Sequence, residues 1–591
     1  MNKKSDFVSN YDKSPYVELP SHQFKCYTGW KEIVRYINEV LNGISKQSKI
    51  IVIECYHGTL DDEILPQLQK YISADFYFSR DCFLPSSEID QLVYPDVTDD
   101  EVFGFMTRLS LEDFFDHLKL RSAQEKIASC NTKNIVIYGT GSSFVHSSPD
   151  LLVYLDMARW EIQLRFRRDE ISNLGVENKT EKFAYQYKRA YFVDWRVCDS
   201  HKKQLMSKWD FVIDTNQPGN PKMISGPALL TAYSHTVQRP FRVVPFFDPG
   251  PWGGQWMKEK FGLDPDVQNF AWGFDCVPEE NSLLLKIGDV LFETPAINLV
   301  FNRPKELLGQ HVQKKFGAEF PIRFDFLDTM AGGNLSLQVH PTTAYIKEQF
   351  GMDYTQDESY YFMESAKGSF VFLGLKENIS PGEMITELKE SQEDNKSFDV
   401  SKFVESWQAK KHDHVLIPAG TVHCSGVNNV VLEISATPYI FTFKLWDWGR
   451  MGLDGKPRPI NIQHGAEVID WSRTTSWVKK ELINRAEKIA EGDGWIEERT
   501  GLHDMQFIET RRHWFTKKVT HYSNGSVNVL NLIEGREAII ESPHNHFEPY
   551  IIHYAETFIV AAAIKEYTIR PYGESVGQTC GTIKAFVKAS E

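Results

Sequence analysis

The chain has 591 residues, too many for a single hydrophobic core, so two to four domains are expected. Its composition, 42% hydrophobic and 25% charged, is that of an ordinary globular protein and leaves little room for extended disorder. The formal net charge of −15 disfavours general nucleic-acid binding, because phosphate contacts need clustered lysine and arginine. A small anionic ligand would need a local cationic pocket.

Signals for membrane insertion or export are missing from the sequence. No run approaches the 18 apolar residues of a membrane span, and Met1 to Val8 carries charge without the apolar core of a signal peptide. The eight cysteines are scattered and form no CxxC pair, which is typical of reduced thiols. We therefore expect a cytoplasmic protein that binds neither membrane nor nucleic acid. The oligomeric state cannot be predicted.

Residues 1–240 alternate short apolar runs with longer amphipathic stretches. Strands are predicted at 49–54, 134–138, 151–156, 191–194 and 211–214, and helical stretches at 90–129 and 158–182. Short buried strands that alternate with helices indicate a three-layer α/β domain with a parallel sheet. We interpret this segment as an accessory domain.

A glycine-containing turn follows the second of these strands, at Gly139-Thr-Gly-Ser-Ser143. Its shape suits a phosphate-cradling loop, but it lacks the GxxxxGK[ST] lysine, and Phe144 takes the last glycine position of GxGxxG. A tight structural turn is the favoured interpretation. With acidic residues at Asp156, Asp194 and Asp214, the domain vaguely resembles a P-loop kinase without its nucleotide motif.

Proline and glycine crowd between residues 240 and 254, which marks the expected first domain boundary. Residues 272–460 favour short strands, interrupted by a polar, helical stretch at 380–411, and 471–498 is predicted to be helical. Strands return at 526–532, 558–560 and 583–587. The predicted domains are thus 1–240, 241–465, and 466–591, the last consisting of a helical connector and a β domain.

Four residues of the middle domain are predicted to bind one metal ion. Gln338 and His340 lie in Asn334-Leu-Ser-Leu-Gln-Val-His-Pro341, where the period of a strand puts them on one face, about 6–7 Å apart. Glu358 begins another strand-like run, and His423 follows the turn Pro418-Ala-Gly420. Two imidazoles, a carboxylate and an amide oxygen suit a borderline divalent ion, with one Zn²⁺ per chain the leading candidate. Since an amide is a weak ligand, a position should stay open for water or substrate.

These segments resemble class I mannose-6-phosphate isomerase, a zinc enzyme of the cupin superfamily. Besides the three segments that contain the four ligands, Pro251-Trp-Gly-Gly254, Glu433-Ile434 and Trp446-Asp-Trp-Gly-Arg450 match family motifs in order. Residues 531–535 and 555–562 look like the second, metal-free cupin. The resemblance covers roughly 241–591 and implies two β-rich cupin (jelly-roll) domains, with zinc held by Gln338, His340, Glu358 and His423 in the first.

The resemblance also implies roles around the metal. Arg450 is expected to assist catalysis or hold the sugar phosphate, although it could simply pair with Asp447. Glu433 is a candidate for proton transfer, or it could orient a neighbouring ligand. Lys444 and Ser336 are candidates for substrate binding. The chain departs from bacterial members at Gln356, where they usually carry lysine, and at Lys444, where they carry arginine.

The expected function is zinc-dependent interconversion of mannose 6-phosphate and fructose 6-phosphate through an enediol-type state. The alternatives are a non-catalytic sugar-phosphate-binding or regulatory cupin protein, or a bifunctional protein with an amino-terminal phosphotransferase. A second metal site at His544-Asn-His546 with Glu548 and His553 is disfavoured, because no further histidine partner is apparent.

Overall fold

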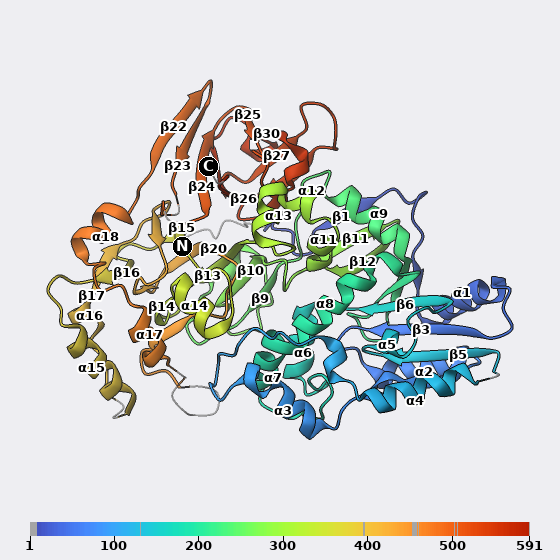
Figure 1. Cartoon of the computed structure of the whole chain (residues 1–591). Coiled ribbons are helices and arrows are strands. Elements are labelled where there is room, and N and C mark those ends of the chain that lie inside the picture. The colour runs from blue at the N-terminus through green and yellow to red at the C-terminus, as the bar shows by residue number, and fades with distance from the viewer. Residues whose placement is uncertain are drawn as a thin grey trace. The chain divides into compact units, whose positions relative to one another are not determined.

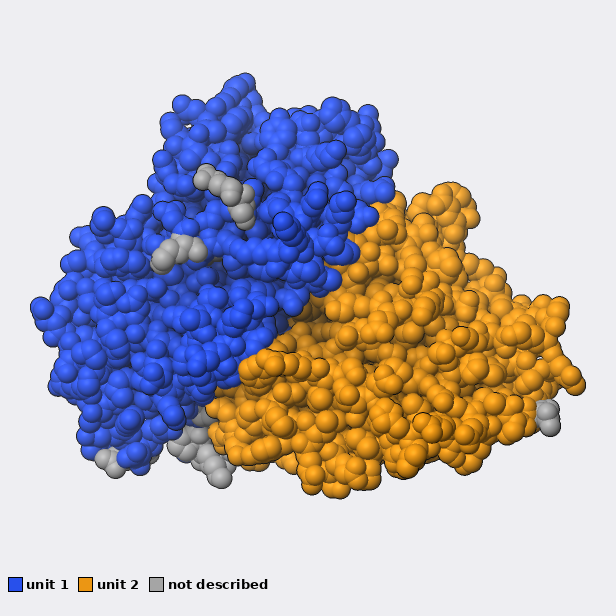
Figure 2. Space-filling view, viewed as in Figure 1, with its two compact units in different colours: residues 1–15, 237–277, 304–591 blue, residues 16–236, 278–303 orange. Residues whose placement is uncertain are grey.

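The computed structural model describes residues 9–130, 132–393, 396–451, 458, 460–501, 503–504 and 506–589. Met1 to Val8, where a signal peptide is not expected, lies outside the described residues. The chain forms two compact units, coloured separately in Figure 2. Unit 1 comprises Met1–Pro15, Val237–Val277 and Pro304–Glu591, and unit 2 comprises Tyr16–Thr236 and Pro278–Arg303. The division into three domains at 240 and 465 stays a prediction.

Unit 2 is built on a seven-stranded sheet with the order β2-β8-β7-β6-β3-β5-β4. Figure 1 shows β6, β3 and β5 of this sheet side by side. The strands are β2 (Tyr27–Thr28), β3 (Lys49–Cys55), β4 (Asp75–Phe78), β5 (Asn134–Gly139), β6 (Leu151–Asp156), β7 (Phe211–Asp214) and β8 (Lys222–Ser225). The five strands β7, β6, β3, β5 and β4 pair in parallel. Strand β8 pairs antiparallel with β7 on one side and with β2 on the other. Four of the five strands predicted in this region are confirmed.

Helices cover both faces of this sheet. On one face, α1 (Trp30–Gly43) and α2 (Asp61–Tyr71) contribute Ile33 and Leu68 to a core with Ile51 and Val153. On the other, Lys202 of α8 (Trp195–Leu205) donates to Asp156 at 2.8 Å. The remaining elements are α3 (Ser86–Val97), α4 (His117–Ala128), α5 (Ser142–Val145), α6 (Arg159–Arg167), α7 (Phe183–Arg189), α9 (Gly226–Thr236), α11 (Ala296–Asn302), and the sheet of β1 (Tyr16–Leu19), β11 (Ser282–Ile287) and β12 (Val290–Pro295).

The strand predicted at 191–194 is wrong. Residues Ala190–Asp194 form a π-helical segment, η3, that joins α7 to α8. All five residues of η3 are buried, which means that this helical segment is enclosed on every side. The run is apolar for that reason. A short apolar run cannot be assigned to strand or helix by periodicity alone.

Unit 1 contains a first pair of β-sheets. The six-stranded sheet has the order β18-β15-β20-β13-β10-β9, and the five-stranded sheet β17-β16-β19-β14-β21. The first consists of β9 (Phe246–Asp248), β10 (Trp272–Cys276), β13 (Ile322–Asp328), β15 (Glu358–Ser365), β18 (His414–Ile417) and β20 (Asn429–Ala436). The second consists of β14 (Leu337–Val339), β16 (Phe370–Leu375), β17 (Val404–Gln408), β19 (His423–Ser425) and β21 (Phe443–Trp446).

Helices surround and interrupt this sheet pair. The expected helical stretch at 380–411 contains α15 (Pro381–Glu393) and α16 (Val400–Phe403) before the chain returns in β17. The others are α10 (Trp256–Lys260), α12 (Pro304–Leu308), α13 (Gln310–Phe316), α14 (Thr343–Phe350), α17 (Ile462–Val468) and α18 (Thr475–Glu481). Among the described residues, no helix has the length and hydropathy of a membrane span.

A second sheet pair completes unit 1, with orders β22-β23-β24-β31-β26-β29 and β25-β30-β27-β28. Its strands are β22 (Glu487–Gly492), β23 (Trp495–Arg499), β24 (Ile508–Phe515), β25 (Val519–Tyr522), β26 (Asn528–Glu534), β27 (Glu537–Glu541), β28 (Tyr550–His553), β29 (Thr557–Val560), β30 (Glu566–Pro571) and β31 (Cys580–Val587). The predicted strands at 526–532, 558–560 and 583–587 are confirmed within one to three residues at their ends.

The predicted helix at 471–498 is correct only for α18. Residues 487–499 instead form the hairpin β22–β23, in which Gly492 pairs with Trp495 across the two-residue turn Asp493-Gly494. Gly494 has φ of +79°, which glycine adopts without strain. An Asp-Gly pair between two strand-forming runs is a hairpin signal, so the sequence carried the information that corrects this prediction.

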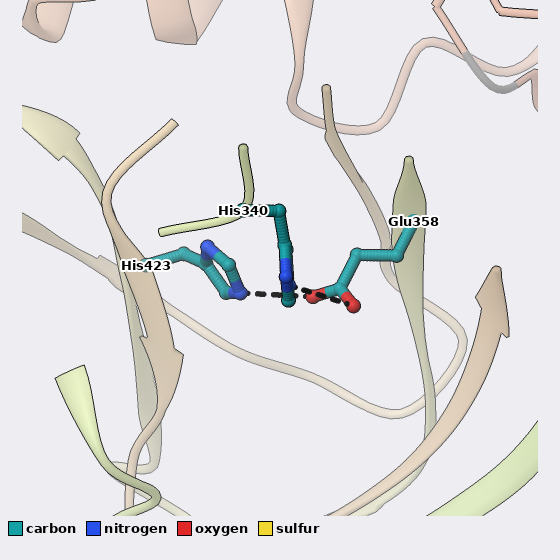
Figure 3. Close-up of side chains that lie close together, drawn as sticks. All are labelled: His340, Glu358 and His423. Carbon is teal, nitrogen blue, oxygen red and sulfur yellow. Dashed lines mark ion pairs between the residues drawn. The ribbon is translucent and has the colours of Figure 1, made fainter. Parts of the chain in front are cut away.

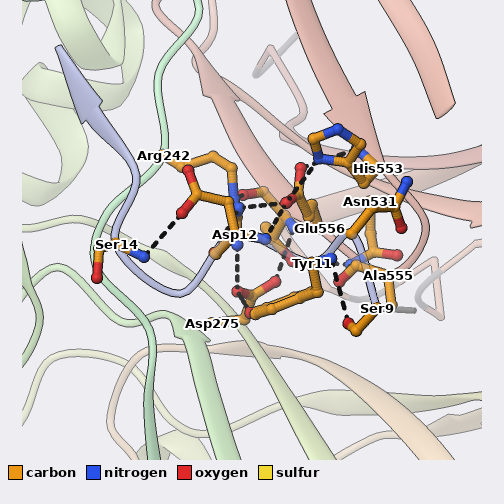
Figure 4. Close-up of polar contacts among 12 residues, drawn as sticks. Ser9, Tyr11, Asp12, Ser14, Arg242, Asp275, Asn531, His553, Ala555 and Glu556 are labelled. Carbon is orange, nitrogen blue, oxygen red and sulfur yellow. Dashed lines mark hydrogen bonds and ion pairs between the residues drawn. The ribbon is translucent and has the colours of Figure 1, made fainter. Parts of the chain in front are cut away.

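Buried Arg242 joins three separate segments of unit 1 (Figure 4). Its guanidinium pairs with Glu556 at 2.7 Å and Asp275 at 3.3 Å, and it donates to the carbonyl oxygen of Asp12 at 2.9 Å. Tyr11 donates its hydroxyl to Asp275 as well. The contacts of Tyr11 and Asp12 with this buried group connect residues 9–15 to the rest of unit 1.

The second sheet pair encloses stacked aromatic rings that include two buried histidines. His521 of β25 stacks on Tyr567 of β30 at 5.1 Å, and its ring lies 4.3 Å from that of His513 of β24. Burial, followed by the neighbouring His513 and Lys584, holds the pKa of His521 well below its usual range. The folded protein therefore keeps this imidazole neutral.

We expect His521 to make the protein less stable in acid. Below the unfolded pKa of about 6.5 the unfolded chain takes up a proton that the fold excludes, so stability falls as pH decreases through that value. His521→Phe should remove about 1–2 kcal/mol of the loss between pH 7 and pH 5. Urea unfolding midpoints at the two pH values measure the effect, with exposed His546→Phe as the control. Identical pH dependence in wild type and His521→Phe would contradict the expectation.

Candidate metal centre

Three side chains from the two facing sheets of the first pair converge on one point (Figure 3). His423 of β19 and His340, which follows β14, come from the five-stranded sheet, and Glu358 of β15 comes from the six-stranded one. Their ligand atoms all lie within 4.8 Å of one another, and all three side chains are completely buried. Among the described residues this is the group of His, Cys, Asp and Glu side chains that could hold a metal ion.

The orientation of both imidazoles is set by backbone carbonyl groups. His340 Nδ1 lies 3.1 Å from the oxygen of Phe441, and His423 Nδ1 lies 2.9 Å from that of Thr421. A carbonyl oxygen only accepts hydrogen bonds, so each Nδ1 must be the donor. Each Nε2 then turns toward Glu358, at 3.1 Å from Oε2 for His340 and 2.8 Å from Oε1 for His423. Such outer contacts orient histidines that bind metals.

This donor set fits a divalent cation. No hydrogen bond from the described residues satisfies His340 Nε2, although the atom is buried. Burial alone would raise the pKa of Glu358, but the two imidazoles hold it well below its usual range, so the carboxylate is ionised. Two imidazole nitrogens and a carboxylate are ligands that zinc prefers, and a cation between them would satisfy all three.

Gln338 lies beside this group, as the period of the strand predicted. It pairs with His423 in the register of β14 and β19, and its amide nitrogen lies 3.2 Å from His423 Nε2. Rotation of the amide by 180° exchanges its nitrogen and oxygen and would turn the oxygen toward the same point. The structure therefore brings all four predicted ligands together, while a coordinating role for Gln338 stays a prediction.

Glu433 lies in the same layer of the six-stranded sheet. In the strand register Glu358 faces Ser435, and Tyr360 faces Glu433. Gln356 donates to both Glu358 at 2.9 Å and Glu433 at 3.3 Å, so one amide connects the two carboxylates. Burial, then the nearby carboxylates of Asp325 and Glu358, raise the pKa of Glu433 well above its usual range, against the opposing effect of Arg323.

Arg323 and Asp325 of β13 are functional candidates that sequence reasoning missed. Arg323 binds Asp325 through two bonds of 2.8 and 3.1 Å and reaches Glu433 at 3.2 Å. No described residue accepts a hydrogen bond from its Nη1, which is buried. The signal was present in Ile322-Arg-Phe-Asp-Phe-Leu-Asp328, since charged residues at alternate positions of a buried strand share one inner face.

A cluster of positive charge surrounds Asp447. Arg450 and Arg458 bind its two oxygens at 3.0 and 2.7 Å, and Ser336 donates to it at 2.7 Å. Arg450 also donates to the carbonyl oxygen of Asn334. The alternative pairing of Arg450 with Asp447 is thus present in the structure. The expected catalytic role of Arg450 and the expected substrate contact of Ser336 stay predictions.

Lys444 connects this cluster to the metal ligands, because it pairs with Gln338 in the register of β14 and β21. Burial, then the cations Arg458 and Arg450, lower the pKa of Lys444 to about 8, against the opposing effect of Asp447. Three cations share one carboxylate here, so the surroundings of Lys444 favour a further anion.

The histidines considered for a second metal site lie outside this centre. His544 and His546 are exposed, with ring centres 5.6 Å apart, and His544 pairs with Glu566 at 3.4 Å. His553 binds Glu556 at 3.1 Å instead of facing them. Among the described residues, the group that could hold a metal ion contains none of these histidines. All eight cysteines are free thiols.

Comparisons with known proteins give two kinds of match. Residues 29–238 match the family model of a domain of unknown function, DUF8485. The chain is 25% identical over 228 residues, 38% of its length, to mannose-6-phosphate isomerase ManA of Bacillus subtilis, and 25% identical over 235 residues to the probable mannose-6-phosphate isomerase GmuF of the same organism. The matched stretches span 66% and 69% of those two relatives, respectively.

Among solved structures, the mannose 6-phosphate isomerase from Bacillus subtilis aligns with 58% of this chain and 99% of its own, at 16% identity and a TM-score of 0.47. The similarity to these isomerases is therefore distant. The resemblance of residues 1–240 to a P-loop kinase stays a prediction, since the model that matches residues 29–238 describes a domain of unknown function.

We expect His423→Ala to abolish metal binding, because it removes one of three strong ligands. Zinc bound per chain, measured by mass spectrometry after dialysis, should fall from one to below about a tenth. His464→Ala provides a control, since His464 bonds to Tyr345 outside the centre. Chelation should also destabilise the wild type, by about 2.7 kcal/mol relative to zinc at 100 times its Kd. Full zinc loading of His423→Ala would contradict this assignment.

Proposed function

We propose that the protein is a zinc-dependent aldose–ketose isomerase that interconverts mannose 6-phosphate and fructose 6-phosphate. The single observation that carries the proposal is the convergence of His340, Glu358 and His423 next to a cationic cluster. The distant similarity to ManA, which is named as a mannose-6-phosphate isomerase, supports the same chemistry. The substrate partner is then a small sugar phosphate.

The metal would be held by His340, Glu358 and His423, with Gln338 as the weaker fourth ligand. When bound, zinc supplies a Lewis acid that stabilises negative charge on the sugar oxygens. The residues around it have complementary tasks. The carbonyl groups of Phe441 and Thr421 hold each imidazole with Nε2 facing inward. Gln356 keeps Glu358 and Glu433 at fixed separation.

Moving a proton between C1 and C2 needs a group that can both accept and release it. Glu433 is our candidate, because its environment favours the protonated form while Arg323 stabilises the ionised one. Arg323 would fix the orientation of the Glu433 carboxylate, since Asp325 binds its guanidinium on the other side. Arg450, Arg458, Lys444 and Ser336 would bind the phosphate group or orient Asp447.

The alternatives make different demands on these residues. A sensor of sugar phosphates would keep the zinc and the cationic cluster but would not need Glu433 to move a proton. An amino-terminal phosphotransferase would need a free phosphate cradle after β5. There, however, the carboxylate of Glu54 accepts hydrogen bonds from the backbone of Gly141 and Ser143. That contact favours the tight structural turn.

We expect Glu433→Gln to lower kcat for mannose 6-phosphate by about 10²–10⁴-fold, the range for loss of a general acid–base group. Bound zinc should stay at the wild-type level, because Glu433 is not a ligand in this assignment. A coupled assay of fructose 6-phosphate formation measures the effect, with Glu364→Gln of the same strand pair as a control. If the zinc-loaded wild type isomerises no hexose phosphate, the sensor interpretation replaces the enzymatic one.

Lys444→Met should weaken substrate binding more than it slows turnover. Loss of one charge-assisted contact to the phosphate is expected to raise KM by about 10–100-fold and to change kcat by less than about threefold. Steady-state kinetics with mannose 6-phosphate separate the two constants. Lys347→Met on the surface of α14 controls for loss of charge, since the Lys347 side chain is 68% exposed. Unchanged KM in Lys444→Met would show that the phosphate binds elsewhere.

A further inference from the structure

Unit 2 contains a cavity of about 340 Å³ that the proposed isomerase chemistry does not use. It lies at the carboxyl ends of β3, β4 and β5 and is lined by residues 57–62, 78–80 and 138–140, with 170–175 on the remaining side. A volume of this size lies within the range of about 300–1,000 Å³ that is typical of small-molecule sites.

The topology of the sheet places this cavity where ligands bind in open α/β folds. Strand β3 pairs with β5 on one side and β6 on the other. From β3 the chain crosses to β4, beyond β5, whereas from β5 it returns across β3 to β6. The connections that leave β3 and β5 therefore run in opposite directions across the sheet. Right-handed crossovers then place them on opposite faces, and a crevice opens between the two strand ends. Ligand sites of such sheets lie at this switch point, outside the carboxyl ends of the strands.

A phosphate group is a poor occupant of this site. The turn after β5 is filled by Glu54, whose carboxylate accepts from Gly141 N at 2.5 Å, Ser143 N at 2.9 Å and Ser142 Oγ at 3.2 Å. The other candidate cradle, the first turn of α2, carries Asp61, Asp62 and Glu63. A second anion at either place would meet a carboxylate that already occupies or repels it.

The charges that line the cavity also disfavour an anionic ligand. Four carboxylates, those of Asp61, Asp62, Glu170 and Glu177, and two cations, Arg80 and Lys179, line the cavity, and Glu170 is paired with Arg168 at 2.9 Å. Arg80 is paired with Asp61 at 3.1 Å and packs over the ring of Phe78. The wall therefore favours ligands without negative charge.

Two side chains of the wall, His57 and Asp61, offer hydrogen-bond acceptors. His57 is 4% exposed, and its Nε2 lies 2.9 Å from the carbonyl oxygen of Ser172, so Nε2 donates and Nδ1 carries a lone pair. No described residue supplies a hydrogen bond to that Nδ1. Asp61 accepts from Tyr138 at 2.8 Å and offers further lone pairs. Phe78, Phe83 and Tyr138 add aromatic surface. Hydroxyl groups on an apolar ring match this combination of acceptors and aromatic faces.

We propose that this cavity binds a small uncharged polyhydroxylated ring, either a free sugar or the sugar of a nucleoside, and that it does not bind phosphorylated compounds. The proposal is independent of the isomerase assignment, because no residue of the metal centre lines the cavity. It gives unit 2, and with it the domain of unknown function, a ligand-binding role without phosphoryl transfer.

The experiment is calorimetric titration of the full-length zinc-loaded protein with mannose, fructose and adenosine, and in parallel with ATP and pyrophosphate. At least one uncharged probe should bind saturably in both the wild type and His423→Ala, which lacks a complete metal centre. ATP and pyrophosphate should neither bind to unit 2 nor displace that probe. The preference between sugars and adenosine then identifies the source of the ring.

Two variants locate the binding. Asp61→Asn keeps the shape of the side chain but removes its charge, and should weaken binding by at least about tenfold. Thr59→Tyr should block the cavity, and Asp81→Asn, at an exposed position outside the lining, should leave the affinity unchanged. The proposal is overturned if none of the uncharged probes binds, if binding is lost in His423→Ala but survives in Asp61→Asn and Thr59→Tyr, or if pyrophosphate competes for the same site.

Discussion

The candidate site depends on the neutralisation of one buried carboxylate. Glu358 is completely enclosed between two sheets, and an isolated ionised carboxylate at such a position would cost several kcal/mol. The facing sheet places His340 and His423 against this carboxylate, and backbone carbonyl groups hold their Nδ1 atoms. The packing of the two sheets and the assembly of the centre are therefore coupled, since the carboxylate on one sheet and the imidazoles on the other satisfy each other.

Charge is arranged in two zones around this centre. On the six-stranded sheet, Glu433, Asp325 and Arg323 form a buried group in which acids outnumber the base. On the five-stranded sheet and the segment after it, Lys444, Arg450 and Arg458 share Asp447. A sugar phosphate has the matching polarity, with hydroxyl and carbonyl groups at one end and an anion at the other. This complementarity supports the proposed substrate class more directly than any single residue does.

Unit 2 shows how a sequence turn that looks suited to phosphate can serve another purpose. Gly139-Thr-Gly-Ser-Ser143 directs backbone amides into a concave site, and Glu54 of the neighbouring strand occupies it. Burial of an internal carboxylate against backbone donors stabilises the turn and removes its capacity for an external anion. The same unit has a cavity at the strand ends, and there the carboxylates of the wall favour an uncharged ligand.

Local sequence patterns were enough to predict four of the five amino-terminal strands, the three carboxyl-terminal ones, and the spacing that places Gln338 and His340, two candidate ligands, on one face. These follow from periodicity and side-chain chemistry, which act over a few residues. The helical form of 191–194 could not be predicted in this way, because burial on all sides removes the periodicity of an amphipathic helix. Likewise, Arg323 and Asp325 join Glu433 through strand pairing between residues about 110 positions apart. Glu54 fills the glycine turn from 87 positions away, and no local pattern encodes a contact made by chain closure over that distance.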